Sequence, residues 1–170
     1  MENLRRELHP DFPQLAAHLT ILPPRPLQGS ESSALQVLER ICGNEVPFEV
    51  TLGDVETFIP VTPTVYIRVD AAAARMSELH SKLNTEALAY KEEWPYIPHL
   101  TIAKMSAERP AQAAFQMARK RWAHYAGSRR ILLERLTFVR EEVGENVPGD
   151  APNCWVDLAP VLLGRTLVSR

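Results

Sequence analysis

Apolar residues recur along the chain with two periods, one typical of helices and one of strands. Longer segments repeat apolar residues every three or four positions, as Met76, Leu79 and Leu83 do, which predicts helices with one buried face. Shorter runs rich in β-branched residues and bounded by proline, glycine or aspartate predict strands. We expect helices over residues 2–8, 30–42, 70–88 and 108–125, and strands over 15–22, 46–59, 64–69, 98–104, 131–142 and 155–163.

Capping and turn residues refine these elements. Ser30 and Asp70 are the expected N-caps of two helices, and Gly53-Asp54 predicts a turn or bulge inside the strand over 46–59. The last two strands are expected to form a hairpin across the loop from Gly144 to Pro152. Helices alternate with strands whose pairing looks antiparallel, so the pattern favours an α+β fold. At 170 residues the chain fits one domain, compact or made of two small lobes.

The net charge of −2 limits the kind of nucleic-acid partner. Proteins that bind long nucleic acids usually carry a clear basic excess, because contacts with phosphates supply most of their affinity. Here 19 basic side chains face 21 acidic ones. Any nucleic-acid substrate is therefore expected to be a nucleotide or an RNA terminus, and not a long nucleic acid.

The sequence gives no sign of a membrane span, a metal site or a redox pair of cysteines. No apolar stretch approaches the length of a membrane span, so no membrane partner is expected. Cys42 and Cys154 lie far apart and form no CxxC pair, which suits a reducing cytoplasm. The five histidines show no spacing typical of metal ligands. We expect a cytoplasmic protein without metal or cofactor.

One tetrapeptide occurs twice, as His18-Leu19-Thr20-Ile21 and His99-Leu100-Thr101-Ile102. Five histidines and nine threonines in 170 residues predict roughly a quarter of one His-x-Thr sequence by chance. A single histidine in an apolar strand is most simply a structural residue, and threonine is a good strand former. Two copies identical over four residues, 81 positions apart, favour a shared function instead.

The tetrapeptide carries chemistry because strand side chains alternate between two faces. Each predicted strand would present its histidine and threonine on one face, roughly 6–7 Å apart, and its leucine and isoleucine on the other. Two such strands beside a cleft would bring together two imidazoles and two hydroxyls. One imidazole can accept a proton from an attacking oxygen while the other donates one to a leaving oxygen. The hydroxyls can donate hydrogen bonds to the non-bridging oxygens of a phosphate.

These motifs resemble those of the 2H phosphoesterase superfamily, and within it the 2'-5' RNA ligase-like family. The resemblance extends to the order and spacing of three runs, which are Pro47 to Gly53, Val65 to Val69 and Tyr96 to Ala103. It implies a bilobal α+β fold with pseudo-two-fold symmetry, antiparallel sheets around a central cleft and helices outside. It also implies activity on 2',3'-cyclic phosphates, 2'-5' phosphodiester linkages or related cyclic nucleotides, with reversible 2'-5' RNA ligation as a further family activity. His18 and His99 would then be the acid/base pair, and Thr20 and Thr101 would hold the phosphate.

Three further residues are candidates for substrate binding. Trp94 and Tyr96 precede the second motif, where an aromatic ring could stack on a base or anchor a loop. Arg25 follows the first motif and could reach a phosphate or remain solvated. Two other functional classes stay open, a nucleotide or RNA-end binding module without catalysis and a metal hydrolase. We expect a monomer or a small homo-oligomer.

Overall fold

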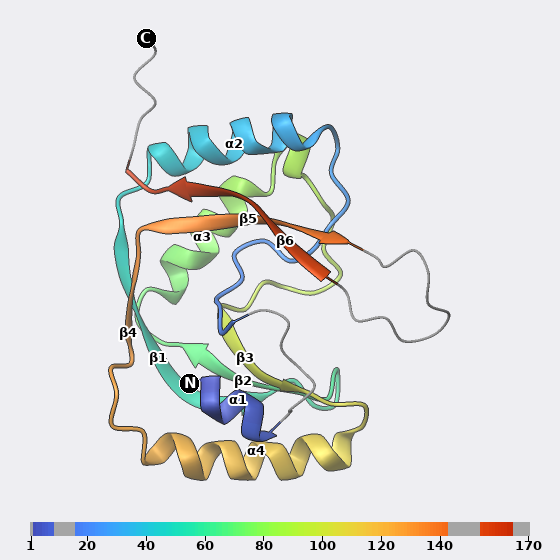
Figure 1. The fold of residues 1–170 in the computed structure, drawn as a ribbon, viewed down its shortest axis with the longest axis vertical. Helices are drawn as coiled ribbons and strands as arrows, with labels where there is room; N and C mark the ends of the chain where they lie inside the picture. Colours follow the sequence, from blue (N-terminus) through green and yellow to red (C-terminus); the bar gives the residue numbers. More distant parts are fainter. Residues whose placement is uncertain (1, 9–15, 143–153, 165–170) are drawn as a thin grey trace. The chain divides into compact units, whose positions relative to one another are not determined.

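The computed structural model describes residues 2–8, 16–142 and 154–164, and Figure 1 shows its elements in chain order. The helical elements are α1 (Glu2–Leu8), α2 (Glu31–Gly43), α3 (Ala73–Leu83), the 3-10 helix η1 (Glu86–Leu88) and α4 (Glu108–Ala123). The strands are β1 (Phe48–Thr57), β2 (Thr64–Val69), β3 (His99–Lys104), β4 (Arg130–Leu133), β5 (Arg135–Glu142) and β6 (Cys154–Leu162). They form a four-stranded sheet in the order β3-β2-β1-β4 and a two-stranded sheet of β5 and β6. The expected α+β class with antiparallel pairing is confirmed.

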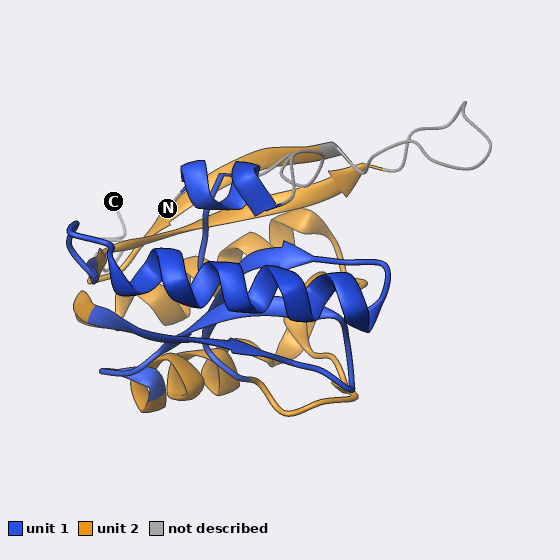
Figure 2. Ribbon diagram, turned by 90° about the horizontal axis from the view of Figure 1, so that it is seen from below, with its two compact units in different colours: residues 1–20, 50–73, 97–131 blue, residues 21–49, 74–96, 132–170 orange. Residues whose placement is uncertain are grey.

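Two compact units divide the chain, and Figure 2 colours them separately. Unit 1 comprises residues 1–20, 50–73 and 97–131, and unit 2 comprises residues 21–49, 74–96 and 132–170. The chain therefore passes from one unit to the other several times. One crossing, at residues 20–21, lies within the first tetrapeptide. Another, at residues 96–97, lies just before the second.

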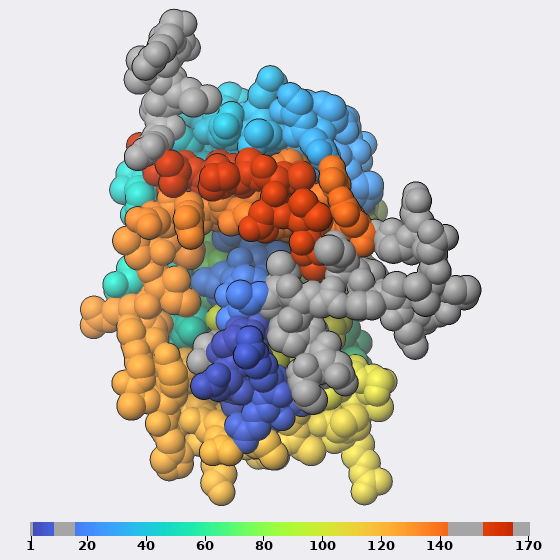
Figure 3. Space-filling view, in the orientation of Figure 1, coloured from blue at the N-terminus to red at the C-terminus, as the bar shows by residue number. Residues whose placement is uncertain are grey.

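Unit 1 is organised by the antiparallel strands β1, β2 and β3, with α4 packed against β2 and β3. Helix α4 lies within the range expected for it, and Ala111, Ala118 and Trp122 on one side of it are buried. The strands against which α4 packs carry the fully buried Ile67 on β2 and Ile102 on β3. The short helix α1 lies beside α4 at the surface of this unit (Figure 3), and Arg121 of α4 donates a hydrogen bond to Glu7 of α1 at 2.5 Å.

The expected irregularity in β1 is present. The register between β1 and β2 shifts between Leu52 and Val55, which places a bulge at Gly53-Asp54. A side chain at Gly53 would have to displace the Asp70 carboxylate, because its Cβ would lie 2.5 Å from that group. The Gly53 carbonyl also accepts a hydrogen bond from Trp122 Nε1 at 2.7 Å, which ties the bulge to α4.

Unit 2 contains α2, α3, η1 and the hairpin of β5 and β6. Helix α2 packs on β6 and η1, and it begins at the predicted cap, where the Ser30 side chain accepts a hydrogen bond from Ser33 N–H. The predicted stripe of α3 is confirmed, since Met76, Leu79 and Leu83 are buried. Cys42 is buried too, and its burial raises the pKa of the thiol to about 11, with the Glu45 charge as a second cause.

Several predicted boundaries are wrong, among them the end of the helix expected to reach residue 88, since α3 ends at Leu83 and η1 is a separate 3-10 helix. Helix α3 begins at Ala73 and not at Asp70, because the Asp70 carboxylate pairs with Arg68 and Ala72 has a φ of 64° outside the helical region. The strand expected over 131–142 is divided into β4 and β5, which belong to different sheets. The predicted hairpin of β5 and β6 is confirmed, but its loop from Gly144 to Pro152 lies outside the described residues.

The strand expected over residues 15–22 is also wrong, since residues 16–22 have no regular secondary structure and residue 15 is not described. Side chains bind the backbone groups that a strand would offer to a neighbour. The Glu2 carboxylate accepts from Ala17 N–H at 2.8 Å, and ring nitrogens contact the carbonyls of Ala16 and Ile21 at 2.7 Å. These bonds occupy three of the backbone groups that a strand ladder would use.

Candidate active site

The second tetrapeptide lies on β3 as predicted, and its side chains alternate between two environments. His99 and Thr101 are half-buried, whereas Leu100 and Ile102 are buried in the core. The register sets His99 opposite Arg68 of β2. Thr101 lies opposite Tyr66 in the same way, and directly opposite residues share one face of a sheet. The polar face of β3 therefore continues onto β2.

The His99 ring is oriented by the backbone just before it. Its Nδ1 lies 2.6 Å from the carbonyl oxygen of Ile97. A carbonyl oxygen only accepts, so Nδ1 carries the hydrogen and Nε2 is left as the atom that exchanges a proton. The rings of Phe58 and Tyr66 meet the imidazole edge to face, with centroids 5.1 and 5.2 Å away. This aromatic wall was missed in the sequence, although the pairing of two neighbouring strands could have indicated Tyr66.

The His18 ring is held in the same way as that of His99. Its Nδ1 lies 2.7 Å from the carbonyl oxygen of Ala16, two residues earlier in the chain, so Nε2 is again the exchanging atom. Helix α1 also holds Ala17, which lies between Ala16 and His18. The Ala17 N–H donates to the Glu2 carboxylate, which pairs with Arg5 at 3.0 Å. Arg5 is buried, with 2% of its side chain exposed. Glu2 and Arg5 were not predicted as part of this site.

The pKa of Glu2 reports how strongly its ionised form is held. Burial alone would raise the pKa of this carboxyl, but the hydrogen bond from Ala17 and the charge and hydrogen bond of Arg5 lower it overall. The carboxylate is thus the form that supports the segment leading to His18.

His18 and His99 both belong to unit 1, and the two imidazoles interact electrostatically. Burial lowers the pKa of His99, the Ile97 carbonyl opposes this by raising it, and the charge of His18 lowers it further. The net effect is a lowered pKa, which favours the neutral imidazole at His99. Thr20 and Thr101 also belong to unit 1, and both are half-buried.

Next to His99 the same sheet face carries a network of charges. Arg68 lies 2.8 Å from Asp70, 3.3 Å from Glu56 and 3.7 Å from Asp54. The Tyr66 hydroxyl donates to Glu56 at 3.0 Å. Burial, assisted by the bond to Glu56 and its charge, raises the pKa of Tyr66 to about 12, so this phenol stays protonated.

The three other candidates lie in unit 2 and have different surroundings. Trp94 is exposed over 60% of its surface. Tyr96 stacks on His80 with ring centroids 4.1 Å apart. The Arg25 side chain is only 4% exposed and pairs with Glu92, and it donates to the Asn84 side chain at 2.9 Å and to the Leu88 carbonyl at 3.3 Å. Their roles in substrate binding stay predictions.

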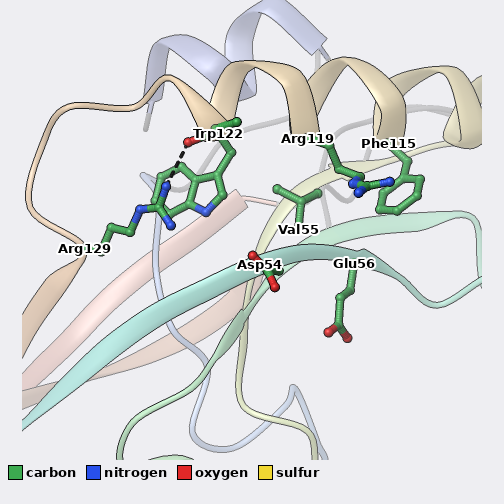
Figure 4. A pocket seen from close by; sticks show the side chains of 8 residues that line it. Asp54, Val55, Glu56, Phe115, Arg119, Trp122 and Arg129 are labelled. Atoms are coloured by element: carbon green, nitrogen blue, oxygen red, sulfur yellow. Dashed lines mark hydrogen bonds between the residues drawn. The ribbon is translucent and has the colours of Figure 1, made fainter.

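A separate hollow of about 400 Å³ lies in unit 1 between β1 and α4. In Figure 4 the Arg129 guanidinium lies against the Trp122 ring and donates to its carbonyl oxygen at 3.0 Å. Glu56 points away from the helix in the same view. No residue of either tetrapeptide lines this hollow.

The described residues, 2–8, 16–142 and 154–164, contain neither a metal-binding cluster nor a membrane-spanning helix. Within them no three His, Cys, Asp or Glu side chains are grouped so as to hold a metal ion. None of the helices in that part of the chain combines the length and apolar character needed to cross a membrane.

Comparison with known proteins places the chain in a family. A solved structure, TT0787 of Thermus thermophilus, superposes with a TM-score of 0.58 over 96% of this chain and 93% of that one at 19% identity, which shows a shared fold. A protein of Oceanobacillus iheyensis named "Putative phosphoesterase OB1230" is 30% identical, and one of Halalkalibacterium halodurans named in the same way is 28% identical. These matches cover 59% of this chain and 59% and 58% of the two relatives, so the chain spans about three fifths of their length. The family model of the 2'-5' RNA ligase superfamily matches residues 1–145, including both tetrapeptides, and the chain belongs to that superfamily.

Proposed function

We propose that the protein is a metal-independent phosphodiesterase that acts on a 2',3'-cyclic phosphate or a 2'-5' phosphodiester of RNA or a small nucleotide. The observation that carries this proposal is the matched pair of hydrogen bonds at His18 and His99. Each Nδ1 bonds the carbonyl two residues earlier, at 2.7 and 2.6 Å, so each ring offers Nε2 for proton transfer. Family membership and the names of the relatives support chemistry on phosphate esters.

The two imidazoles take different roles in hydrolysis of a cyclic phosphate. His99, whose lowered pKa favours the neutral form, accepts a proton from the attacking water at Nε2. The water oxygen bonds to phosphorus, and the bond from phosphorus to the 2' or 3' oxygen breaks. His18 donates its Nε2 proton to that leaving oxygen, and the product is a phosphomonoester with a free hydroxyl. The chemistry needs one neutral and one protonated ring, and the interaction between the two imidazoles supports such a division.

Thr20 and Thr101 supply neutral hydrogen-bond donors to the phosphate. Each lies two residues after a catalytic histidine. A hydrogen bond donated by a hydroxyl to a non-bridging oxygen stabilises the charge that develops there in the transition state. If an RNA 5'-hydroxyl took the place of the attacking water, its oxygen would bond to phosphorus, the bond from phosphorus to the 3' oxygen would break, and the same groups would form a 2'-5' phosphodiester, which is 2'-5' ligation.

A substrate panel with chelator tests this proposal. Nucleoside 2',3'-cyclic phosphates, 2'-5' dinucleotides and 3'-5' dinucleotides are incubated with the wild-type protein in the presence and absence of EDTA. We expect turnover of a member of the first two groups that EDTA leaves unchanged. His18→Ala and His99→Ala should each lower kcat by about 10²- to 10⁴-fold.

His124→Ala is the matched control, because His124 is an exposed histidine of unit 1 whose Nδ1 also contacts a carbonyl, that of Lys120. It should retain wild-type activity. Binding of a nucleotide without any product would instead favour the binding module, and loss of turnover in EDTA would favour a metal hydrolase.

A further inference from the structure

A largely buried polar cluster of unit 2 adjoins both tetrapeptides along the chain. It consists of Arg25, His80, Glu92 and Tyr96, which all belong to this unit. The chain enters unit 2 at Ile21, directly after Thr20, and leaves it after Tyr96, three residues before His99. The cluster thus involves the chain that directly follows the first motif and the chain that shortly precedes the second.

His80 is the centre of this cluster. It lies on α3 with 8% of its side chain exposed. Its Nδ1 is 2.7 Å from the carbonyl oxygen of Ile21, and its Nε2 is 3.1 Å from the Glu92 carboxylate. The carbonyl can only accept, so Nδ1 is the donor in the first bond. Ile21 is the last residue of the first tetrapeptide, and its side chain is 7% exposed.

Glu92 is itself held in place by Arg25. The Arg25 guanidinium pairs with Glu92 and spans to Asn84, whose Oδ1 accepts at 2.9 Å. The same Asn84 oxygen accepts from the Tyr90 N–H at 2.8 Å. The segment from 84 to 92 is therefore tied to the chain just after the first motif, and His80 binds a carboxylate of fixed position.

Tyr96 extends the cluster to the second motif. Its ring lies flat on the His80 imidazole, with centroids 4.1 Å apart and an interplanar angle of 0°. The next residue, Ile97, offers the carbonyl that orients His99 through Nδ1. One imidazole thus contacts the chain one residue after Thr20 and one residue before Ile97.

We propose that His80 is a positioning residue that sets the placement of both catalytic histidines by binding the Ile21 carbonyl and stacking on Tyr96. The inference rests on the proposed function. Catalysis by paired imidazoles depends on their separation, and a displacement of about 1 Å can cost about a hundredfold in rate. His80 belongs to neither tetrapeptide, and it would act on both through the chain that continues from them.

Two amide substitutions separate the contacts of His80. In His80→Asn the amide nitrogen replaces Nδ1 and can still donate to Ile21, whereas in His80→Gln it replaces Nε2 and reaches towards Glu92. We expect His80→Gln to lower kcat on the active substrate at least tenfold with KM changed less than threefold. His80→Asn, which keeps the bond to Ile21 but loses the stacked ring, should lose less kcat than His80→Gln. Tyr96→Leu, which removes the stacked ring, should lower kcat more than Tyr96→Phe, which keeps it.

Val37→Ala is the control for a general loss of stability, because Val37 is a buried residue of α2 in the same unit and is not part of the cluster. All variants are assayed well below their melting temperatures. An equal loss of kcat in Val37→Ala, or wild-type kcat in His80→Gln and Tyr96→Leu, would overturn the proposal.

A second measurement needs no turnover. NMR signals of the His18 and His99 rings should shift in His80→Gln and stay in place in Val37→Ala. Unshifted rings in His80→Gln would overturn the positioning role. If the wild-type protein turns over no member of the substrate panel, the proposed function fails, and the ring shifts still decide whether His80 positions the two histidines.

Discussion

His18 and His99 are oriented by the same local bond, from Nδ1 to the carbonyl oxygen two residues earlier, although only His99 lies on a strand. The bond forms at the first residue of β3 for His99 and beside a bend at Ala17 for His18. The two rings therefore present the same nitrogen, Nε2, from different secondary structures. The sequence predicted a strand for each motif. The two rings are oriented alike even though only the second motif lies on a strand.

The electrostatic coupling of the two histidines predicts a response of His99 to changes at His18. The charge of His18 is one cause of the lowered pKa of His99. His18→Ala removes that charge and should raise the pKa of His99 towards its ordinary value, while burial still keeps it low. An NMR titration of the His99 ring in both proteins measures this. An unchanged titration midpoint would show that the rings do not interact.

The lowered pKa of His99 also predicts how stability depends on pH. The unfolded chain binds a proton at His99 near pH 6.5, before the folded protein does. Stability from this group is therefore complete above that pH and is lost as the pH falls through the lower folded-state pKa. His99→Asn, which does not titrate, should show a smaller loss of melting temperature than wild type between pH 7 and pH 5. Parallel melting curves for the two proteins would contradict the direction of the shift.

The threonine hydroxyls are expected to act on the transition state more than on binding. Thr20→Val and Thr101→Val keep the shape of the side chain and remove the donor. Each should lower kcat by about 10²-fold, the effect of losing one donor to a developing oxyanion. Thr20→Ser and Thr101→Ser retain a hydroxyl and should recover most activity. Steady-state kinetics on the active substrate compares the four variants, and equal activity of valine and serine variants would exclude the role.

Glu2 is expected to support both the fold and the first histidine. Glu2→Ala removes the acceptor for Ala17 N–H and one partner of the buried Arg5, which should cost about 2 kcal/mol of unfolding free energy. Glu2→Gln keeps an oxygen that can accept from Ala17 and should lose less. Denaturant unfolding measures both, and kcat should fall in the same order. Wild-type stability in Glu2→Ala would show that α1 does not hold this segment.

Much of the fold could be predicted from local patterns. The strand over 64–69, the helix capped by Ser30 and the bulge at Gly53-Asp54 all depend on residues close together in sequence. The strand of the first motif could not be predicted in the same way. Residues 16–22 have the composition of a strand, but Glu2, His18 and His80 bind their backbone groups in place of a paired strand.

By itself the sequence determined the family, the paired His-x-Thr motifs and the alternation that sets His99 and Thr101 apart from Leu100 and Ile102. These follow from residue identity and from the two-residue period of a strand. Only the tertiary structure decided which residues surround the motifs. Tyr66 and Phe58 beside His99, Glu2 beside Ala17, and His80 beside Ile21 come from distant parts of the chain. Packing brings them together, and no local pattern of hydrophobic and polar positions encodes such long-range contacts.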